Sequence, residues 1–276
     1  MAHQAENIVS AFRALHQRDG IFVIPNPWDV GSARILAGLG FEALATTSAG
    51  MAFALGHCEG AVSAEATLEH CREIVASTPL PVTADLEKGF GDSPESVADT
   101  IRAAAQTGLA GCSIEDHTGR PDDPIYDFGL AVERIAAAVE TCRTLPGGML
   151  LTARAENFCW GRMDFDDTLK RLEAFAAAGA DVLYAPGVDD LERIRDICSA
   201  LDQPVNVVTG LPGKRHTLAE LADAGVKRAS IGAAFARAAY GALITAATEI
   251  TQDGRFTFAD ELIGFAELNA FFEPFG

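Results

Sequence analysis

Short strand-like runs alternate with helical segments along almost the whole chain. Eight such runs occur, at residues 21–26, 43–48, 81–86, 111–116, 149–154, 181–186, 204–209 and 228–232. Strands that alternate with helices form parallel sheets, and eight units in about 250 residues are typical of a (β/α)₈ TIM-type barrel. The even spacing leaves no room for an interdomain linker. The sequence therefore predicts a single α/β domain over residues 1–276, folded as a (β/α)₈ barrel.

Composition narrows the range of partners and compartments. The 276 residues include 39 acidic and 21 basic side chains, a formal net charge of −18. Binding to nucleic acid or to an anionic membrane needs basic patches, so we expect neither partner. No apolar run approaches the roughly 18 residues of a membrane span. The six cysteines form no C-x-x-C pair and the N-terminus does not read as a signal peptide, which favours a cytoplasmic protein.

Polar side chains alternate with apolar ones near the end of several strand-like runs. Asp85 and Glu87 share one face of the third run, Glu115 lies late in the fourth, and Arg154 ends the fifth. Side chains alternate between the two faces of a strand. The helix-covered face of a barrel is apolar, so the polar face lines the lumen, and barrel active sites lie at the C-terminal ends of the strands. The same rule directs these residues into the lumen: Thr46, Ser48, Thr83, Ser113, Thr152 and Asn206.

The predicted barrel mouth holds an excess of negative charge. Asp85, Glu87 and Glu115 converge there beside Arg154, and two carboxylates about 4 Å apart repel by roughly 4 kcal/mol at an effective dielectric constant of 20. A hard divalent cation would relieve this repulsion, and Mg²⁺ or Mn²⁺ suits a site of carboxylates and water. The alternative is an ion pair inside the lumen between Glu87 and Arg154, without a metal.

Six segments in this order resemble the isocitrate lyase/phosphoenolpyruvate mutase superfamily. They are NPWDVGSAR (26–34), TTSAG (46–50), TADLEKGFG (83–91), SIED (113–116), TARAE (152–156) and PVNVV (204–208). The resemblance implies a barrel that holds Mg²⁺ and acts on small 2-oxo or 2-hydroxy carboxylates. It also implies that a C–C or P–C bond is broken or made through a metal-bound enolate.

The resemblance also implies roles for individual residues. Asp85 matches the direct metal ligand, whereas Glu87 and Glu115 match ligands that bind the metal through water. Arg154 matches the catalytic arginine that takes the substrate carboxylate, for which a bidentate guanidinium is suited. The remaining expected substrate contacts are Trp28, Asp29, Ser48, Ala49, Gly50 and Asn206.

Two departures from the family pattern bear on the reaction. In the loop after the second strand many members carry an aspartate, and here Glu59 is the candidate substitute. The loop after the fourth strand, residues 115–129, contains neither the lysines nor the cysteine of isocitrate and methylisocitrate lyases, nor the lysine of the mutases. Proton transfer is then left to His117, Thr118, Arg120 or His57. His117 is our candidate catalytic residue, although a lone histidine also serves as a simple hydrogen-bond partner.

These observations predict a Mg²⁺-dependent lyase-type enzyme for a small 2-oxo or 2-hydroxy acid. Decarboxylation or C–C cleavage is preferred, and isocitrate lyase activity itself is not expected. The alternatives are a phosphonopyruvate-type P–C hydrolase or mutase, and a non-catalytic protein that binds 2-oxo acids.

The C-terminal segment 256–276 is rich in phenylalanine at near-helical spacing. It is more apolar than a terminal surface helix should be. In the resembling family the last helix is exchanged between subunits. We therefore expect 256–276 to form an oligomerisation helix, exchanged between the subunits of a homodimer or homotetramer. Packing of this helix on its own barrel is the alternative.

Overall fold

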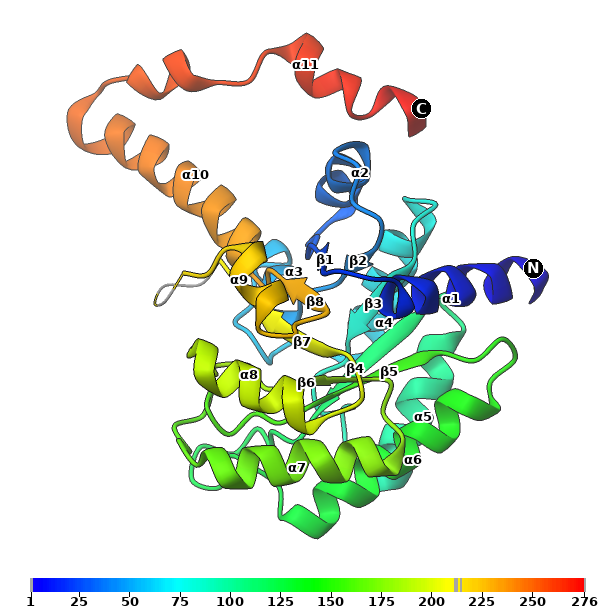
Figure 1. Ribbon diagram of the computed structural model, residues 1–276. Helices are drawn as coiled ribbons and strands as arrows, with labels where there is room; N and C mark the ends of the chain where they lie inside the picture. Colours follow the sequence, from blue (N-terminus) through cyan, green and yellow to red (C-terminus); the bar gives the residue numbers. More distant parts are fainter. Residues whose placement is uncertain (1, 211–212, 214, 276) are drawn as a thin grey trace.

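Eight parallel strands form the centre of the computed structural model, which describes residues 2–210, 213 and 215–275 (Figure 1). They are hydrogen-bonded in the order β1-β8-β7-β6-β5-β4-β3-β2. The amide of Ala45 donates to the carbonyl of Pro25 at 3.0 Å and links the two remaining edges. The barrel is thus nearly closed, and the predicted (β/α)₈ fold is confirmed. The strands are β1 (Phe22–Ile24), β2 (Leu44–Ala45), β3 (Val82–Asp85), β4 (Gly111–Glu115), β5 (Leu150–Arg154), β6 (Val182–Tyr184), β7 (Val205–Val208) and β8 (Arg228–Ser230).

Helices follow the strands and cover the barrel. Ser93 caps one of them, because its hydroxyl accepts a hydrogen bond from the Ser96 amide at the helix N-terminus. The helices are α1 (Ala2–Gln17), α2 (Val30–Gly38), α3 (Ser48–Ala54), α4 (Ala64–Ala76), α5 (Pro94–Ala105), α6 (Phe128–Thr144), α7 (Phe165–Ala178), α8 (Leu191–Ala200), α9 (Leu218–Asp223), α10 (Ala234–Asp253) and α11 (Phe265–Ala270).

Helix α1 covers the end of the barrel at which the strands begin. Phe12 is buried in a cluster with Phe22, Ala110 and Leu150, which lie at or just before the starts of β1, β4 and β5. A Cβ at Gly111 would lie 3.0 Å from the Phe12 ring, so the helix packs closely on the strand ends. With this end covered, the opposite end of the strands is left to form the site.

The strands present apolar residues outward and polar residues inward, as the alternation predicts. Cys112 and Ile114 of β4 belong to the main hydrophobic core between sheet and helices. Thr152 and Asn206 are buried polar residues that share hydrogen bonds with Arg228 across the lumen. Each strand therefore contributes to two environments, an apolar shell and a polar lumen.

The C-terminal segment differs in form from the single helix expected over 256–276. After α10 the chain forms a 3₁₀ turn (Thr257–Glu261), the six-residue α11 and a second 3₁₀ turn (Glu273–Phe275). Glycines interrupt it, since Gly254 ends α10 with a left-handed φ of 63° and Gly264 precedes α11. The expectation of one helix is wrong.

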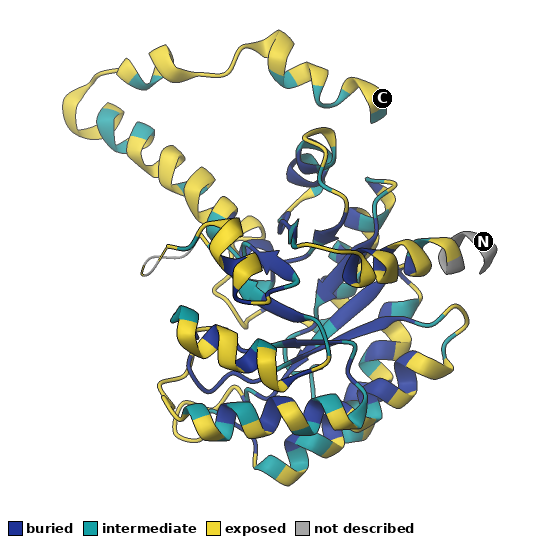
Figure 2. Cartoon of the chain, viewed as in Figure 1, coloured by how far each residue is buried: buried dark blue, intermediate teal, exposed yellow. Residues whose placement is uncertain are grey.

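Helix α10 and the tail extend away from the barrel, and most of their surface is exposed (Figures 1 and 2). Phe265 is 89% exposed, whereas the Phe275 ring lies 5.1 Å below the Arg34 guanidinium of α2. Subunit exchange of this segment stays a prediction. The other large exposed apolar side chains described in α10 and the tail are Phe235, Leu243, Ile244, Ile250, Phe256, Leu262 and Ile263.

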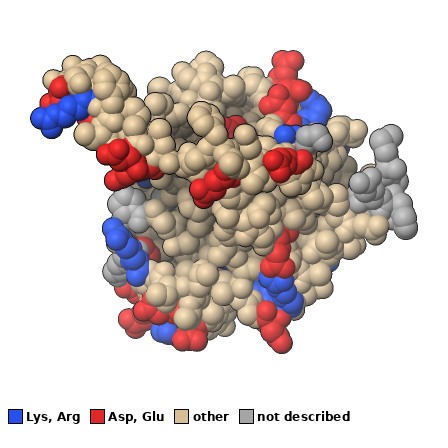
Figure 3. Space-filling view, turned by 90° about the horizontal axis from the view of Figure 1, so that it is seen from above, with Lys and Arg blue, Asp and Glu red and all other residues tan. Residues whose placement is uncertain are grey.

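No helix among the described residues is both long enough and apolar enough to span a membrane. On the face shown in Figure 3, Lys and Arg side chains are scattered among acidic ones and form no continuous patch.

Candidate active site

The C-terminal ends of β3, β4 and β5 bring three predicted site residues together. Glu115 pairs with Arg154 in the register of β4 and β5, and Asp85 pairs with Ser113 in the register of β3 and β4. Asp85, Glu115 and Arg154 are each the last residue of their strand. The sequence prediction that they meet at one barrel end is therefore confirmed.

Arg154 is the centre of a cluster of ion pairs. Its Nη1 lies 3.0 Å from Asp85 Oδ1, and its Nη2 lies 3.1 Å from Glu115 Oε2 and 2.7 Å from Glu156 Oε1. The Nε group also donates to Glu156 Oε1, at 2.8 Å. Glu87, the partner considered in the metal-free alternative, is not among these ion pairs. Arg154 therefore balances carboxylates from β3, from β4 and from the loop after β5.

Asp85 accepts hydrogen bonds on both carboxylate oxygens. Ser48 Oγ donates to Oδ2 at 2.9 Å, and the Glu87 amide donates to Oδ1 at 3.1 Å. Burial alone would raise the pKa of Asp85, but the charge of Arg154 and the hydrogen bond from Ser48 hold this pKa below its usual value. Asp85 is consequently an ionised carboxylate at the mouth.

Glu87 lies just beyond β3 in a strained backbone conformation. Its φ is 50°, in the left-handed region that residues other than glycine seldom adopt. Burial, followed by repulsion from Asp85 and Glu115, raises the pKa of Glu87 to about 7. The pKa of Glu59 is raised as well, by partial burial and then by Asp85 and Glu115. Glu59, in the loop after β2, is thus electrostatically coupled to the same cluster, and its catalytic role stays a prediction.

The charges at the mouth suit a divalent cation. Among the described residues, the charges of Asp85 and Glu115 act on Glu59 and Glu87, the charge of Glu115 acts on Glu156, and Arg154 opposes the negative charge. Within the same part of the chain, no three His, Cys, Asp or Glu side chains are gathered closely enough to hold a metal ion by themselves. A site with one direct carboxylate, further carboxylates acting through water, and open positions for substrate fits both observations. Mg²⁺ usually keeps several waters of this kind.

His117 lies beside the mouth and stacks on Trp160. The two rings are 3.7 Å apart between centroids and nearly parallel, at 7°. His117 Nδ1 is 3.6 Å from Glu115 Oε1. The stack joins the loops after β4 and β5. Of the other candidates in this region, Arg120 and His57 are exposed, and the Thr118 hydroxyl donates to the Asp123 carbonyl within its own loop. His117 is thus the candidate acid that the fold places closest to the carboxylates.

The loop after β4 is tied to the loop after β3. Lys88 Nζ donates to the Asp92 carboxylate at 2.8 Å and to the Thr118 carbonyl at 2.9 Å, and the Tyr126 hydroxyl donates to Asp92 at 2.5 Å. The buried Arg134 donates to the carbonyls of Lys88, Gly91 and Asp92. These bonds hold the two loops together beside the mouth.

Residues of the predicted substrate-binding loops have local structural roles. The Asp29 side chain caps α2 by accepting from the Ser32 amide at 2.7 Å. The Gly50 amide donates to Thr47 Oγ1 at 3.2 Å, and a Cβ on Gly50 would lie 3.0 Å from that of Trp28. Glycine therefore lets the loop after β1 pack on α3. A contact of these residues or of Ala49 with substrate stays a prediction.

Asn206 is buried on β7 inside the lumen. Its Oδ1 accepts from Arg228 Nε at 2.8 Å and its Nδ2 donates to Ser230 Oγ at 2.9 Å. One amide hydrogen of Asn206 is left for another acceptor. A substrate contact through this hydrogen stays a prediction.

Three site residues were missed by the sequence reasoning. Glu156 continues the alternation of Thr152 and Arg154 and could have been found by extending it two residues. Tyr184 ends β6 as the register partner of Arg154, so the same rule applied to β6 would have found it. Trp160 carries no sequence signal, because its stacking on His117 depends on the conformations of two loops.

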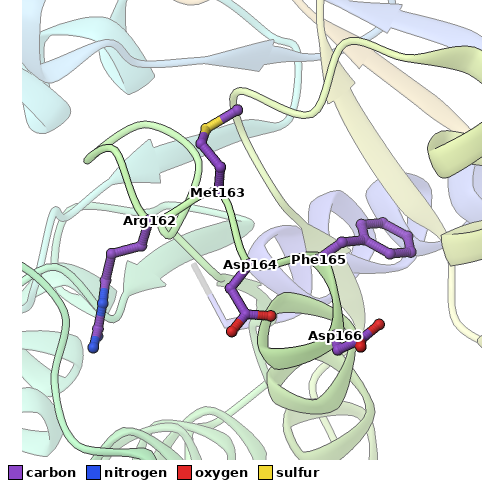
Figure 4. Close-up of a pocket in the computed structure, with 5 residues that line it drawn as sticks. All are labelled: Arg162, Met163, Asp164, Phe165 and Asp166. Atoms are coloured by element: carbon purple, nitrogen blue, oxygen red, sulfur yellow. The ribbon is translucent and has the colours of Figure 1, made fainter.

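A shallow surface hollow of about 610 Å³ follows the loop after β5 (Figure 4). None of the mouth carboxylates lines it. We therefore place the chemistry at the barrel mouth and not in this hollow. Its lining residues are Arg162, Met163, Asp164, Phe165 and Asp166.

The parallel barrel, with an arginine and carboxylates at the ends of β3 to β5, defines the structural class of the protein. Residues 12–251 match the family model described as phosphoenolpyruvate phosphomutase. The chain belongs to this family, within the phosphoenolpyruvate mutase/isocitrate lyase superfamily.

Three similar proteins illustrate the range of the family. A crystal structure from Burkholderia cenocepacia J2315, provisionally assigned as a lyase/mutase, shares 54% identity, covers 98% of this chain and 97% of its own, and superimposes with a TM-score of 0.95. An oxaloacetate decarboxylase from Chromohalobacter salexigens is 30% identical over 91% of this chain and 86% of its own. The structure of an oxaloacetate acetylhydrolase in complex with oxalate is 26% identical over 96% of this chain and 94% of its own, with a TM-score of 0.86.

Proposed function

We propose that this protein is a Mg²⁺-dependent carbon–carbon lyase that decarboxylates or cleaves a small 2-oxo acid through an enolate. The observation that carries the proposal is the Arg154 cluster, in which one guanidinium contacts both Asp85 and Glu115. Asp85 would hold Mg²⁺ directly and Glu87 and Glu115 through water, and the ion would supply Lewis-acid stabilisation of negative charge on substrate oxygens.

Arg154 has two sets of partners in this proposal. In the structure Nη1 contacts Asp85 and Nη2 contacts Glu115. A cation held by those carboxylates would leave one N–H of each nitrogen for a substrate carboxylate. Glu156, which contacts Nε and Nη2, would keep the guanidinium in place. The arginine thus exchanges an internal carboxylate for that of the substrate.

Decarboxylation of a 3-carboxylated 2-oxo acid such as oxaloacetate is the preferred reaction. The C3–C4 bond breaks, CO₂ leaves, and the electron pair forms the C2–C3 double bond while the C2 oxygen becomes negative. C3 then takes up one proton. The departing CO₂ needs no proton of its own, which agrees with a 115–129 loop that lacks the cysteine and lysines of the citrate-type lyases. The similarity to an oxaloacetate decarboxylase supports this choice.

A side-by-side assay tests the proposal. Oxaloacetate, isocitrate, methylisocitrate and phosphonopyruvate are each incubated with Mg²⁺ or with chelator, and CO₂, glyoxylate, pyruvate and phosphate are measured. We expect Mg²⁺-dependent CO₂ release from oxaloacetate, lost in Asp85→Ala and retained in Asp99→Ala, an exposed carboxylate of α5. Phosphate release would favour the P–C hydrolase, and a mutase would convert phosphonopyruvate into phosphoenolpyruvate. Binding of oxalate without turnover of any substrate would favour the non-catalytic binder.

A further inference from the structure

Tyr184 lies at the mouth and has no role in the reaction as proposed above. Tyr184 ends β6 beside Arg154, its partner in the register of the two strands. The Arg154 guanidinium lies 5.3 Å from the centre of the Tyr184 ring. A carboxylate held by Arg154 is therefore a neighbour of this phenol.

The Tyr184 hydroxyl is free to act. In the described part of the chain no hydrogen bond to this hydroxyl is found. Since it is also not one of the fully buried polar atoms that lack a partner, it is accessible to solvent. The residue is half-buried. Since β6 ends at the same edge as β5, the hydroxyl is reached from the mouth.

Four other groups that could carry a proton at the mouth are engaged. Ser48 Oγ donates to Asp85 at 2.9 Å, and an arginine such as Arg154 does not release a proton in proteins. His117 lies flat on Trp160 with Nδ1 directed at Glu115. Burial and then the charge of Glu156 raise the pKa of the Cys159 thiol to about 12, and its hydrogen bond goes to that carboxylate.

We infer that Tyr184 is the general acid that protonates C3 of the enolate, an assignment that rests on the proposed function. The phenol O–H bond breaks, its proton forms the new C3–H bond, and the C2 carbonyl is restored. The phenolate then regains a proton from solvent at the open mouth. One proton is consumed for each CO₂ released, which balances the conversion of the oxaloacetate dianion into the pyruvate monoanion.

Burial keeps the phenol in its protonated form. Burial, against the opposing charge of Arg154, raises the pKa of Tyr184 above its ordinary value. The raised pKa favours the protonated phenol, which is the form that donates. A positioned general acid contributes about 10²–10⁴-fold to the rate of the step it serves.

The test separates bond cleavage from protonation. CO₂ and keto-pyruvate are followed together during turnover of oxaloacetate with Mg²⁺, in wild type and in Tyr184→Phe. Wild type should produce the two in step. The variant should release CO₂ ahead of keto-pyruvate, because enolpyruvate leaves the site and ketonises in solution. Cys159→Ala and His117→Ala test the two rival proton donors. In both variants CO₂ and keto-pyruvate should still appear at the same rate.

A binding measurement guards against a merely structural effect. Oxalate affinity in the presence of Mg²⁺, measured by calorimetry, should change by less than about threefold in Tyr184→Phe, since the phenol ring remains. Synchronous products from Tyr184→Phe would refute the assignment, as would a lag confined to one of the rival variants. Absence of CO₂ release from wild type would refute the proposed function and the role of Tyr184 with it.

Discussion

Glu87 links the stability of the protein to pH and to the proposed cation. Its pKa rises from 4.5 to about 7 because the site is partly buried and because Asp85 and Glu115 repel a third negative charge. The native and unfolded pKa values of Glu87 thus differ by about 2.5 units. This difference changes the free energy of unfolding by about 3 kcal/mol at most, since each pKa unit is worth about 1.36 kcal/mol. The native state binds this proton more tightly than the unfolded state. The stability that Glu87 contributes is therefore complete below pH 4.5 and is lost as the pH rises through about 7.

Glu87→Gln removes this titration and keeps the backbone and side-chain volume. In chelator, the variant should match wild type near pH 4.5 and exceed its free energy of unfolding by up to about 3 kcal/mol at pH 8. Urea denaturation at both pH values measures the difference. Glu133→Gln, at an exposed position of α6, is the matched control and should follow wild type.

Addition of Mg²⁺ at pH 8 should make wild type more stable to unfolding than Glu87→Gln. A ligand that binds only the native state stabilises it by mass action, and the cation competes with the proton on Glu87. Mg²⁺ should therefore stabilise wild type more at pH 8 than at pH 5.5 and stabilise Glu87→Gln much less. The reasoning fails if the variant is no more stable than wild type at pH 8 in chelator.

Three further predictions concern the metal, the loops and the tail. Asp85→Ala should abolish Mg²⁺ binding in calorimetry while the far-ultraviolet circular dichroism is kept; unchanged affinity would contradict the ligand assignment. Arg134→Met should lower the free energy of unfolding by about 3 kcal/mol, because carbonyls of the loop after β3 lose their donor, whereas Arg102→Met on the surface of α5 should change it by less than about 0.5 kcal/mol. Deletion from Phe256 onward should reduce the oligomeric mass in light scattering or cause aggregation, and an unchanged mass would count against subunit exchange.

Strand positions and lumen residues could be predicted because they follow from short-range rules. All eight strands lie within the predicted runs, and period-two alternation alone separates the outward Ile114 from the inward Glu115. Parallel strands end at a common edge, so Asp85, Glu115 and Arg154 had to meet once the barrel was assumed. The same rule, extended by two residues, would have included Glu156.

Other features could not be predicted because they depend on contacts between distant loops. His117 and Trp160 stack only because the loops after β4 and β5 fold toward each other. The tail was misjudged for a different reason. Its phenylalanine spacing suggested one helix, but Gly264 separates the 3₁₀ turn (Thr257–Glu261) from the six-residue α11, and this glycine was visible in the sequence.

The charge at the mouth makes cation and substrate dependent on each other. Arg154, Asp85, Glu115 and Glu156 are each at most 18% exposed, so solvent screens their interactions weakly. A dianionic substrate that approached this cluster without a cation would add to the repulsion that already raises the pKa of Glu87. In the proposed function a divalent cation would lower that repulsion and draw Asp85 and Glu115 away from Arg154, so it would both admit the substrate and free the group that binds it. Because such coupling is reciprocal, oxalate should tighten Mg²⁺ binding by the same factor by which Mg²⁺ tightens oxalate binding. Replacement of Arg154 by lysine should reduce that factor, since a lysine cannot keep its bond to Glu156 and also take a carboxylate in bidentate fashion.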